Sequence, residues 1–178
     1  MLNVFKNRGF TLIELVVTIC ILGIVMAIAI PSFTSTIRNN TIASISNNMI
    51  ASLNYARSEA IKRNTPVSVC APTDSSYSAC GSNWSLGWLV FVNPNGANVV
   101  VNSTAAPLLR VEAITDQSIN LTTNPSVGIA TYNGSGFPAQ NTANVVFTIK
   151  ATGCTGDAGR QISISMTGRS SVTSVTCP

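Results

Sequence analysis

The 178-residue sequence contains no histidine and only six carboxylic side chains, and charged residues make up 9% of it, against about 25% in typical soluble proteins. The lack of histidine excludes His-ligated metal sites and nucleophiles activated by an imidazole. So few carboxylates also leave little scope for general acid–base catalysis. We therefore expect no enzyme, no catalytic residue, no metal site and no cofactor.

Apolar residues, by contrast, make up 46% of the chain and are concentrated near its start. Residues 10–30 carry a single charge, Glu14, and are followed directly by Pro31. A helix rises about 1.5 Å per residue, so this run is long enough to cross the roughly 30 Å hydrocarbon core of a bilayer. We predict a membrane-spanning helix over residues 10–30 and one globular domain over residues 31–178.

The nine residues before this run contain Lys6 and Arg8 and no acid. Basic residues ahead of a single apolar span hold the N-terminus in the cytoplasm, which places everything after Ile30 on the far side of the membrane. A cleaved secretory signal peptide is the alternative. Its apolar core is shorter and precedes a small-x-small cleavage site, which is not found after Ile30.

Glu14 is a carboxylate inside an apolar helix, which costs on the order of 2.5 kcal/mol or more without a partner. No basic side chain lies between Gly9 and Arg38. Two interpretations remain open. Glu14 either snorkels to the interface or is protonated, or it pairs with a group from outside the span, such as a backbone amine freed by cutting the leader.

Four of the five cysteines lie beyond the apolar run, and an even number there predicts disulfides in an oxidising compartment. Four cysteines allow three pairings. We choose Cys70 with Cys80 and Cys154 with Cys177, because short loops close at the lowest entropic cost. Free thiols are the alternative; zinc is disfavoured because the chain has no CxxC pair.

Beyond Pro31 the apolar spacing stays helical, and we predict one helix from Phe10 to Arg63, bent near Pro31 and ended by Asn64-Thr65-Pro66. Short segments rich in β-branched residues then alternate with Gly, Pro, Asn and Ser. These predict strands over residues 67–70, 87–92, 98–101, 108–113, 118–122, 144–150, 161–166 and 171–175. The expected fold class is α+β, a long N-terminal helix packed on an antiparallel sheet.

Gly9-Phe10-Thr11-Leu12-Ile13-Glu14, after a short basic leader, closely resembles the class III signal of type IV prepilins and type II secretion pseudopilins. The resemblance implies that a prepilin peptidase cuts after Gly9 and methylates Phe10. It implies that Glu14 pairs with a neighbouring subunit's N-terminal amine during assembly, and that Pro31 is the helix-kinking proline. The implied partners are the peptidase, other minor and major pilins, and the bacterial inner membrane.

The rest of the chain is similar to the pseudopilin and minor pilin group named for GspH and FimT. The resemblance rests on segments 56–64, 67–70, 84–96, 134–137, 147–150 and 160–169. It implies a pilin-like fold and a periplasmic globular domain that reaches the pilus or cell surface after assembly. The implied function is pilus assembly in a tip or priming complex, with a pseudopilin of type II secretion as the alternative. We expect Trp84, Trp88 and Phe91 to be core residues.

Some FimT-like proteins bind DNA during natural transformation through a C-terminal Gly-Arg-x-Arg motif. The matching place here reads Gly168-Arg169-Ser170-Ser171, without the second arginine. Lys150, Arg160 and Arg169 lie in the same C-terminal strand region and could form a weak, nonspecific phosphate-binding cluster. The alternative is that these three are separate, solvated charges.

Overall fold

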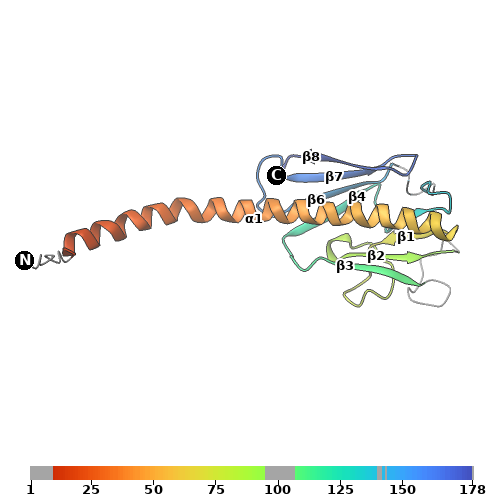
Figure 1. Ribbon diagram of the computed structural model, residues 1–178, viewed down its shortest axis with the longest axis horizontal. Helices are drawn as coiled ribbons and strands as arrows, with labels where there is room; N and C mark the ends of the chain where they lie inside the picture. Colours follow the sequence, from red (N-terminus) through yellow and green to blue (C-terminus); the bar gives the residue numbers. More distant parts are fainter. Residues whose placement is uncertain (1–9, 95–106, 140–141, 143, 178) are drawn as a thin grey trace, which may run out of the picture. The chain divides into compact units, whose positions relative to one another are not determined.

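The computed structural model describes residues 10–94, 107–139, 142 and 144–177. The chain forms two compact units, one up to Ile37 and one from Arg38 onward, and a single helix, α1 (Leu12–Arg63), contributes to both (Figure 1). Helix α1 continues through Pro31, and the bend expected there stays a prediction. The leader, residues 1–9, and the strand expected over residues 98–101 lie outside the described residues.

The second half of α1 supplies one wall of the globular core. Its fully buried apolar side chains recur three, four or seven positions apart, which places them on one face of a helix; they are Ile42, Met49, Leu53, Ala56 and Ala60. The sequence predicted this stripe. It explains why a helix with many asparagines and serines on its other faces is stable here, since tertiary packing outweighs their modest helix propensity.

The helix ends where the sequence predicted. Asn64 adopts a left-handed conformation with φ 47°. The N–H of Thr65 donates to the carbonyl of Ala60 and the N–H of Asn64 to that of Ile61, both at 3.2 Å. These two bonds form a Schellman motif, which satisfies the last helical carbonyls. Pro66 follows and directs the chain into the first strand.

The described strands form two antiparallel four-stranded sheets (Figure 1). The first has the order β3-β2-β1-β5, and its strands are β1 (Val67–Cys70), β2 (Gly87–Val92), β3 (Leu108–Ala113) and β5 (Ile129–Tyr132). The second has the order β4-β6-β7-β8, and its strands are β4 (Ile119–Asn124), β6 (Val146–Ala151), β7 (Gly159–Ile164) and β8 (Ser170–Val175). The pilin-like α+β class is confirmed, and the antiparallel strands are divided between two sheets.

Strand β5 was not predicted from the sequence. It is only four residues long, and it pairs with β1, more than fifty residues earlier in the chain. Its placement closes the first sheet next to the helix-facing core, where Ala130 and Tyr132 are fully buried. A short strand fixed by such a distant partner has little local signal.

The main core lies between α1 and the two sheets, and a short 3-10 helix, η1 (Trp84–Leu86), contributes to it. Trp84 packs edge-on against Phe147 of β6, with ring centroids 5.0 Å apart, and its indole N–H donates to the carbonyl of Val127 at 2.7 Å. Trp88 is also in this core, and Phe91 is buried in a smaller cluster on the other face of the first sheet. All three were predicted as core residues.

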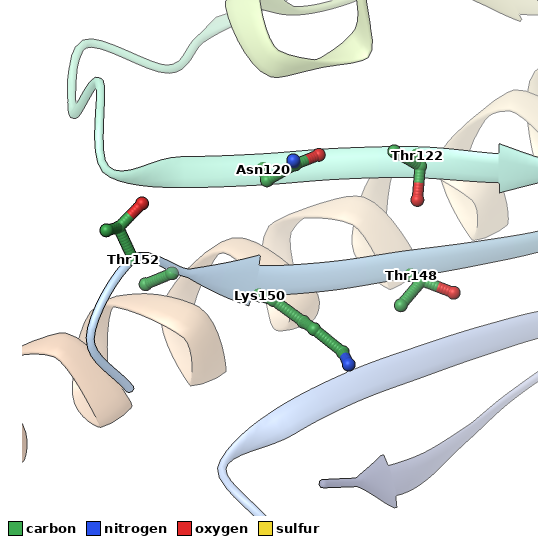
Figure 2. A pocket seen from close by; sticks show the side chains of 6 residues that line it. Asn120, Thr122, Thr148, Lys150 and Thr152 are labelled. Carbon is green, nitrogen blue, oxygen red and sulfur yellow. The ribbon is translucent and has the colours of Figure 1, made fainter. Parts of the chain in front are cut away.

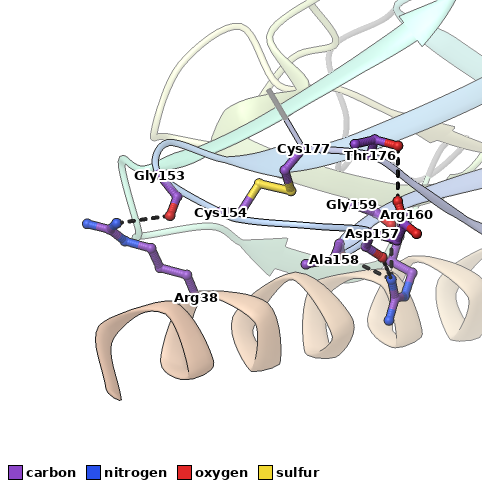
Figure 3. Close-up of a disulfide and its surroundings, with 9 residues drawn as sticks. All are labelled: Arg38, Gly153, Cys154, Asp157, Ala158, Gly159, Arg160, Thr176 and Cys177. Carbon is purple, nitrogen blue, oxygen red and sulfur yellow. Dashed lines mark hydrogen bonds between the residues drawn. A yellow bond between two sulfur atoms is a disulfide. The ribbon is translucent and has the colours of Figure 1, made fainter. Parts of the chain in front are cut away.

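Two disulfides stabilise the domain, and their pairing is the one predicted from the short loop lengths. Cys70 pairs with Cys80, which lies in the loop between β1 and η1. Cys154 pairs with Cys177, and this disulfide joins the loop after β6 to the segment after β8 (Figure 3). The fifth cysteine, Cys20, is unpaired and exposed on the N-terminal half of α1.

Arg57 of α1 holds two turns of the domain together. Its Nε donates to the carbonyl of Gly136 and its Nη2 to that of Thr167, both at 2.9 Å. Gly136 and Gly168 have positive φ and approach so closely that a Cβ on Gly168 would lie 2.5 Å from the Gly136 oxygen. A planar guanidinium can reach two carbonyls with a fixed fork, which a lysine cannot do.

We expect Arg57→Lys to lower the free energy of unfolding by about 1–2 kcal/mol, because one carbonyl loses its charged donor. Urea denaturation of the full chain in detergent measures the change. Arg38→Lys is a suitable control, since the Arg38 guanidinium donates to a single carbonyl among the described residues, from Nη1 to that of Gly153 at 3.2 Å. Equal effects of the two substitutions would contradict the bridging role.

Candidate functional site

The start of α1 is a capping box built from Thr11 and Glu14. The backbone N–H of Thr11 donates to Glu14 Oε2 at 2.9 Å, and the Thr11 hydroxyl donates to the same oxygen at 2.8 Å. In return the N–H of Glu14 donates to Thr11 Oγ1 at 3.3 Å. Reciprocal bonds of this kind satisfy N–H groups that have no partner within the helix. Glu14 therefore has a local structural role as well as a charge.

Around this box the helix presents an apolar surface. Glu14 lies with Phe10, Ile13, Val17 and Thr18 along a shallow hollow of the helix surface. Helix α1 contains a stretch with a mean hydropathy of 2.8 and none of that stretch is buried, so its length and composition suffice to cross a membrane. Outside a bilayer or an assembly, this surface would remain in water, which is unfavourable for so much apolar area.

The geometry leaves Glu14 able to accept a further donor. The hydrogen bonds that its carboxylate accepts from the described residues both go to Oε2, so Oε1 still has acceptor capacity. The site is a carboxylate in apolar surroundings, four positions after Phe10 in the chain. Such a site favours a cationic partner, because a carboxylate in a low-dielectric medium needs a compensating charge. Gly9, the expected cleavage residue, lies outside the described residues.

The sequence analysis identified Glu14 but missed the role of Thr11. The signal was present, since Thr11-Leu12-Ile13-Glu14 has the Thr-x-x-Glu spacing of a capping box before an apolar run. The helix accordingly begins at Leu12, with Thr11 as its cap, rather than at Phe10.

The basic side chains of the globular unit form a second candidate site. Six of the eight bind groups of their own chain: Arg38, Arg57 and Arg160 bind carbonyls, Lys62 and Arg63 bind Glu59, and Arg110 binds Glu112. The hydrogen bond from Arg63 lowers the pKa of Glu59, which keeps that carboxylate charged. Among the described residues, only the side chains of Lys150 and Arg169 lack such a partner.

The structure does not bring Lys150, Arg160 and Arg169 together. Lys150 lies between the buried Ile149 and Ala151 on β6, so its side chain is on the outward face of the sheet. Arg160 lies on the opposite face, next to the buried Ile162 on β7. Arg169 pairs with Ser165 in the β7–β8 turn, about 17 Å along β7 from Arg160.

Arg160 is also occupied within its own loop. Its Nη1 donates to the carbonyls of Asp157, Ala158 and Gly159 at 3.0–3.1 Å (Figure 3). The same nitrogen donates to Ser174 Oγ at 3.3 Å. A guanidinium with these bonds supports the chain that leads into β7. Contacting a phosphate with this nitrogen would require giving up some of them.

Lys150 lines a shallow hollow of about 360 Å³ on the outward face of β4 and β6 (Figure 2). Its other lining residues are uncharged: Asn120, Thr122, Thr148, Ala151 and Thr152. The hollow presents hydroxyls and amides with a single cation. It is a small, weakly charged surface, in keeping with the Ser-, Thr- and Asn-rich exterior of the domain.

Two models of known protein families match the chain. The model of type II transport protein GspH matches residues 46–168, and that of the prokaryotic N-terminal methylation motif matches residues 4–30. The chain therefore belongs to the GspH family of minor pilins and pseudopilins and carries its prepilin-type N-terminus. This confirms the family resemblance seen in the sequence. No curated protein matches the sequence.

Solved structures show the same fold. Two crystal structures of the type IV minor pilin FimU of Pseudomonas aeruginosa (strain PAO1) are similar to this chain at 24% sequence identity. The first has a TM-score of 0.57 and covers 78% of this chain and 96% of that one. The second has a TM-score of 0.55 and covers 76% and 99%. The likeness establishes a pilin-like architecture.

Proposed function

We propose that this chain is a minor pilin that a prepilin peptidase cuts after Gly9 and methylates at Phe10, and that it then assembles through α1. The observation that supports this most is the placement of Glu14. It caps the start of a helix whose apolar surface is exposed, five positions after the glycine of the methylation motif. In this role the free amine of a neighbouring subunit's Phe10 supplies the missing charge.

Before assembly the chain is anchored in the bacterial inner membrane by residues 10–30, with its N-terminus in the cytoplasm. Lys6 and Arg8 support this orientation. The two disulfides support a periplasmic location for residues 31–178, since the periplasm is oxidising. In the assembled state the hydroxyl-rich globular domain faces water. The apolar half of α1 is then covered by the corresponding helices of other pilins.

The assignment to a pilus tip or priming complex is tested by deletion of the chain from its host. We expect surface filaments to become about tenfold or more less abundant, because a subunit that starts assembly is needed once per filament. Shearing and immunoblotting of the major pilin measure this, with the restored chain as control. Normal piliation together with lost export of folded substrates would instead assign the chain to type II secretion.

DNA capture is a second possible role of the same domain, but the arrangement of the cations gives it little support. Lys150 and Arg169 are the two basic side chains with no partner in the described part of the domain, and they lie on different parts of it. Two phosphate contacts give a slope of log K against log salt of only about −1.4 to −1.8. That corresponds to weak binding without sequence preference.

We expect the double substitution Lys150→Ala, Arg169→Ala to leave both piliation and natural transformation unchanged. The two side chains are removed together because neither makes a hydrogen bond or ion pair within the described residues, so the fold should be preserved. Transformation frequency and DNA retention by the full chain in detergent are the readouts. A drop of about tenfold in either one, with normal piliation, would establish the DNA role.

A further inference from the structure

The two sheets have four outer edges, and three of these are protected within the described residues. Strand β3 carries the Arg110–Glu112 ion pair, and its pairing with β2 shifts register at Val90/Phe91. Charged side chains and such irregularities discourage pairing with another strand. On β5, the N–H of Ala139 donates to Thr131 at 2.8 Å, so the following segment covers that edge. Strand β4 is covered by η1, where Ser85 accepts from the Leu121 N–H at 3.1 Å.

Strand β8 forms the fourth edge, and the described residues give it none of these protections. Its six residues, Ser-Ser-Val-Thr-Ser-Val, include no charge and no proline. It lies at the end of the sheet order β4-β6-β7-β8, with β7 as its only neighbouring strand among the described residues (Figure 1). An edge without charges, prolines or bulges presents unpaired N–H and C=O groups to which another strand can bind.

The backbone groups that face outward on β8 follow from its pairing. The N–H of Ser165 donates to the carbonyl of Arg169 at 3.0 Å, which makes these two residues a hydrogen-bonded pair. Hydrogen-bonded and non-hydrogen-bonded pairs alternate along an antiparallel ladder. The alternate residues Ser170, Val172 and Ser174 therefore direct their N–H and C=O groups away from β7. These groups form an open ladder for one more strand.

Contacts at both ends hold β8 in place. At its start the Ser170 hydroxyl donates to Asn54 Oδ1 of α1 at 3.2 Å. At its end the disulfide from Cys177 to Cys154 and the bond from Thr176 Oγ1 to Asp157 Oδ1 at 3.0 Å fix the chain. A strand held at both ends loses little conformational entropy on binding, which favours a partner. The Val172 side chain is 46% exposed and would be covered by an added strand.

We propose that β8 is a docking edge for an extended strand of another pilin-type subunit, which would add a fifth strand to the second sheet. This inference rests on the proposed assembly function. Main-chain hydrogen bonds would supply the affinity, as in other cases of strand addition. Charge complementarity sets the orientation: Arg169 precedes β8 and Asp157 lies beside its end, so an incoming strand fits best with an acid near Arg169.

The occupant is a different chain rather than the β8 strand of a second, antiparallel copy. Strand β8 begins beside Asn54 and ends near the loop whose Gly153 binds Arg38, so it runs against the direction of α1. A two-fold antiparallel pair of β8 strands would place the N-terminal ends of the two helical segments at opposite ends of the pair. In the proposed assembly through α1 the helices of neighbouring subunits run in the same direction, which this pair does not allow.

Hydrogen exchange of the full chain in detergent tests the proposal. The purified pilin-type subunits of the same host are added one at a time, and deuterium uptake is followed over residues 169–177. We expect one of them to slow the exchange of the Ser170, Val172 and Ser174 amides by about tenfold or more. Exchange over β3 should not change. No protection from any subunit, or protection by the chain's own self-association, would overturn the proposal.

Two matched substitutions separate edge docking from general damage to the fold. Val172→Lys places a charge on the open edge, and Val111→Lys places one on the protected β3 edge, where the native valine is 40% exposed. We expect only the first to abolish the protection and the incorporation that depends on it. Equal losses from both would overturn the docking edge. The proposal would also be overturned if the partner subunit still slowed amide exchange over β8 in the Val172→Lys variant, with the two variants melting at the same temperature. Neither result would affect the role of Glu14 in assembly.

Discussion

Replacement of Glu14 by alanine is expected to reduce incorporation of the chain into filaments by at least about thirtyfold, because truncating one partner of a desolvated charge pair costs roughly 2–5 kcal/mol. Cleavage should continue, since the peptidase cuts the bond between Gly9 and Phe10, which does not include Glu14. Quantitative immunoblotting of sheared filaments, compared with the processed chain in the membrane, measures the ratio of incorporated to available subunit.

The capping box allows the charge of Glu14 to be separated from its hydrogen bonds. In Glu14→Gln the side-chain oxygen can still accept from Thr11, so the start of the helix should be preserved. We expect this variant to fail in assembly almost as fully as Glu14→Ala. If Glu14→Gln is incorporated normally, the carboxylate charge is not what assembly requires. The pairing with a neighbouring amine would then be wrong.

Removal of the Cys154–Cys177 disulfide is expected to lower the free energy of unfolding by about 3 kcal/mol, because a loop of this length loses its closure constraint in the unfolded chain. The sequence separation of the two cysteines is 23 residues. The change is made as Cys154→Ser with Cys177→Ser, so that no free thiol remains. Urea denaturation of the full chain in detergent, followed by tryptophan fluorescence, gives the shift in midpoint.

The matched control is Cys20→Ser, since Cys20 is exposed on α1 and makes no disulfide. We expect its unfolding midpoint to agree with that of the unmodified chain. If the double serine variant also unfolds at the same urea concentration, the bond contributes nothing to stability. The β8 segment would then be held by its pairing with β7 and by the Ser170 and Thr176 contacts.

The long helix could be predicted from the sequence because its signals are local. The apolar run from Phe10 to Ile30, the buried stripe from Ile42 to Ala60 and the stop at Asn64 each arise from residues a few positions apart. The prepilin motif is also contiguous, so it could be recognised without a structure, and the roles of Gly9, Phe10 and Glu14 stay predictions. The capping partner Thr11 was within reach by the same reasoning, since its spacing from Glu14 is fixed.

The features that could not be predicted from the sequence depend on contacts between distant segments. Strand β5 exists because Ile129–Tyr132 pairs with β1, and the division into two sheets depends on which strands neighbour each other. The separation of Lys150 from Arg160 follows from strand alternation, which places successive residues on opposite faces. Their assignment to opposite faces needed the exact pairing of Ile149 with Arg160. The double role of Arg57 likewise joins turns about 80 and 110 residues away.

The central claim is that the mature chain begins at Phe10 as a methylated prepilin product. Intact-mass and N-terminal peptide mass spectrometry of the protein extracted from membranes tests it most directly. We predict a single species that begins at N-methylated Phe10 and contains the Cys70–Cys80 and Cys154–Cys177 disulfides. A chain that still begins at Met1, or one that begins after Ile30, would contradict the claim.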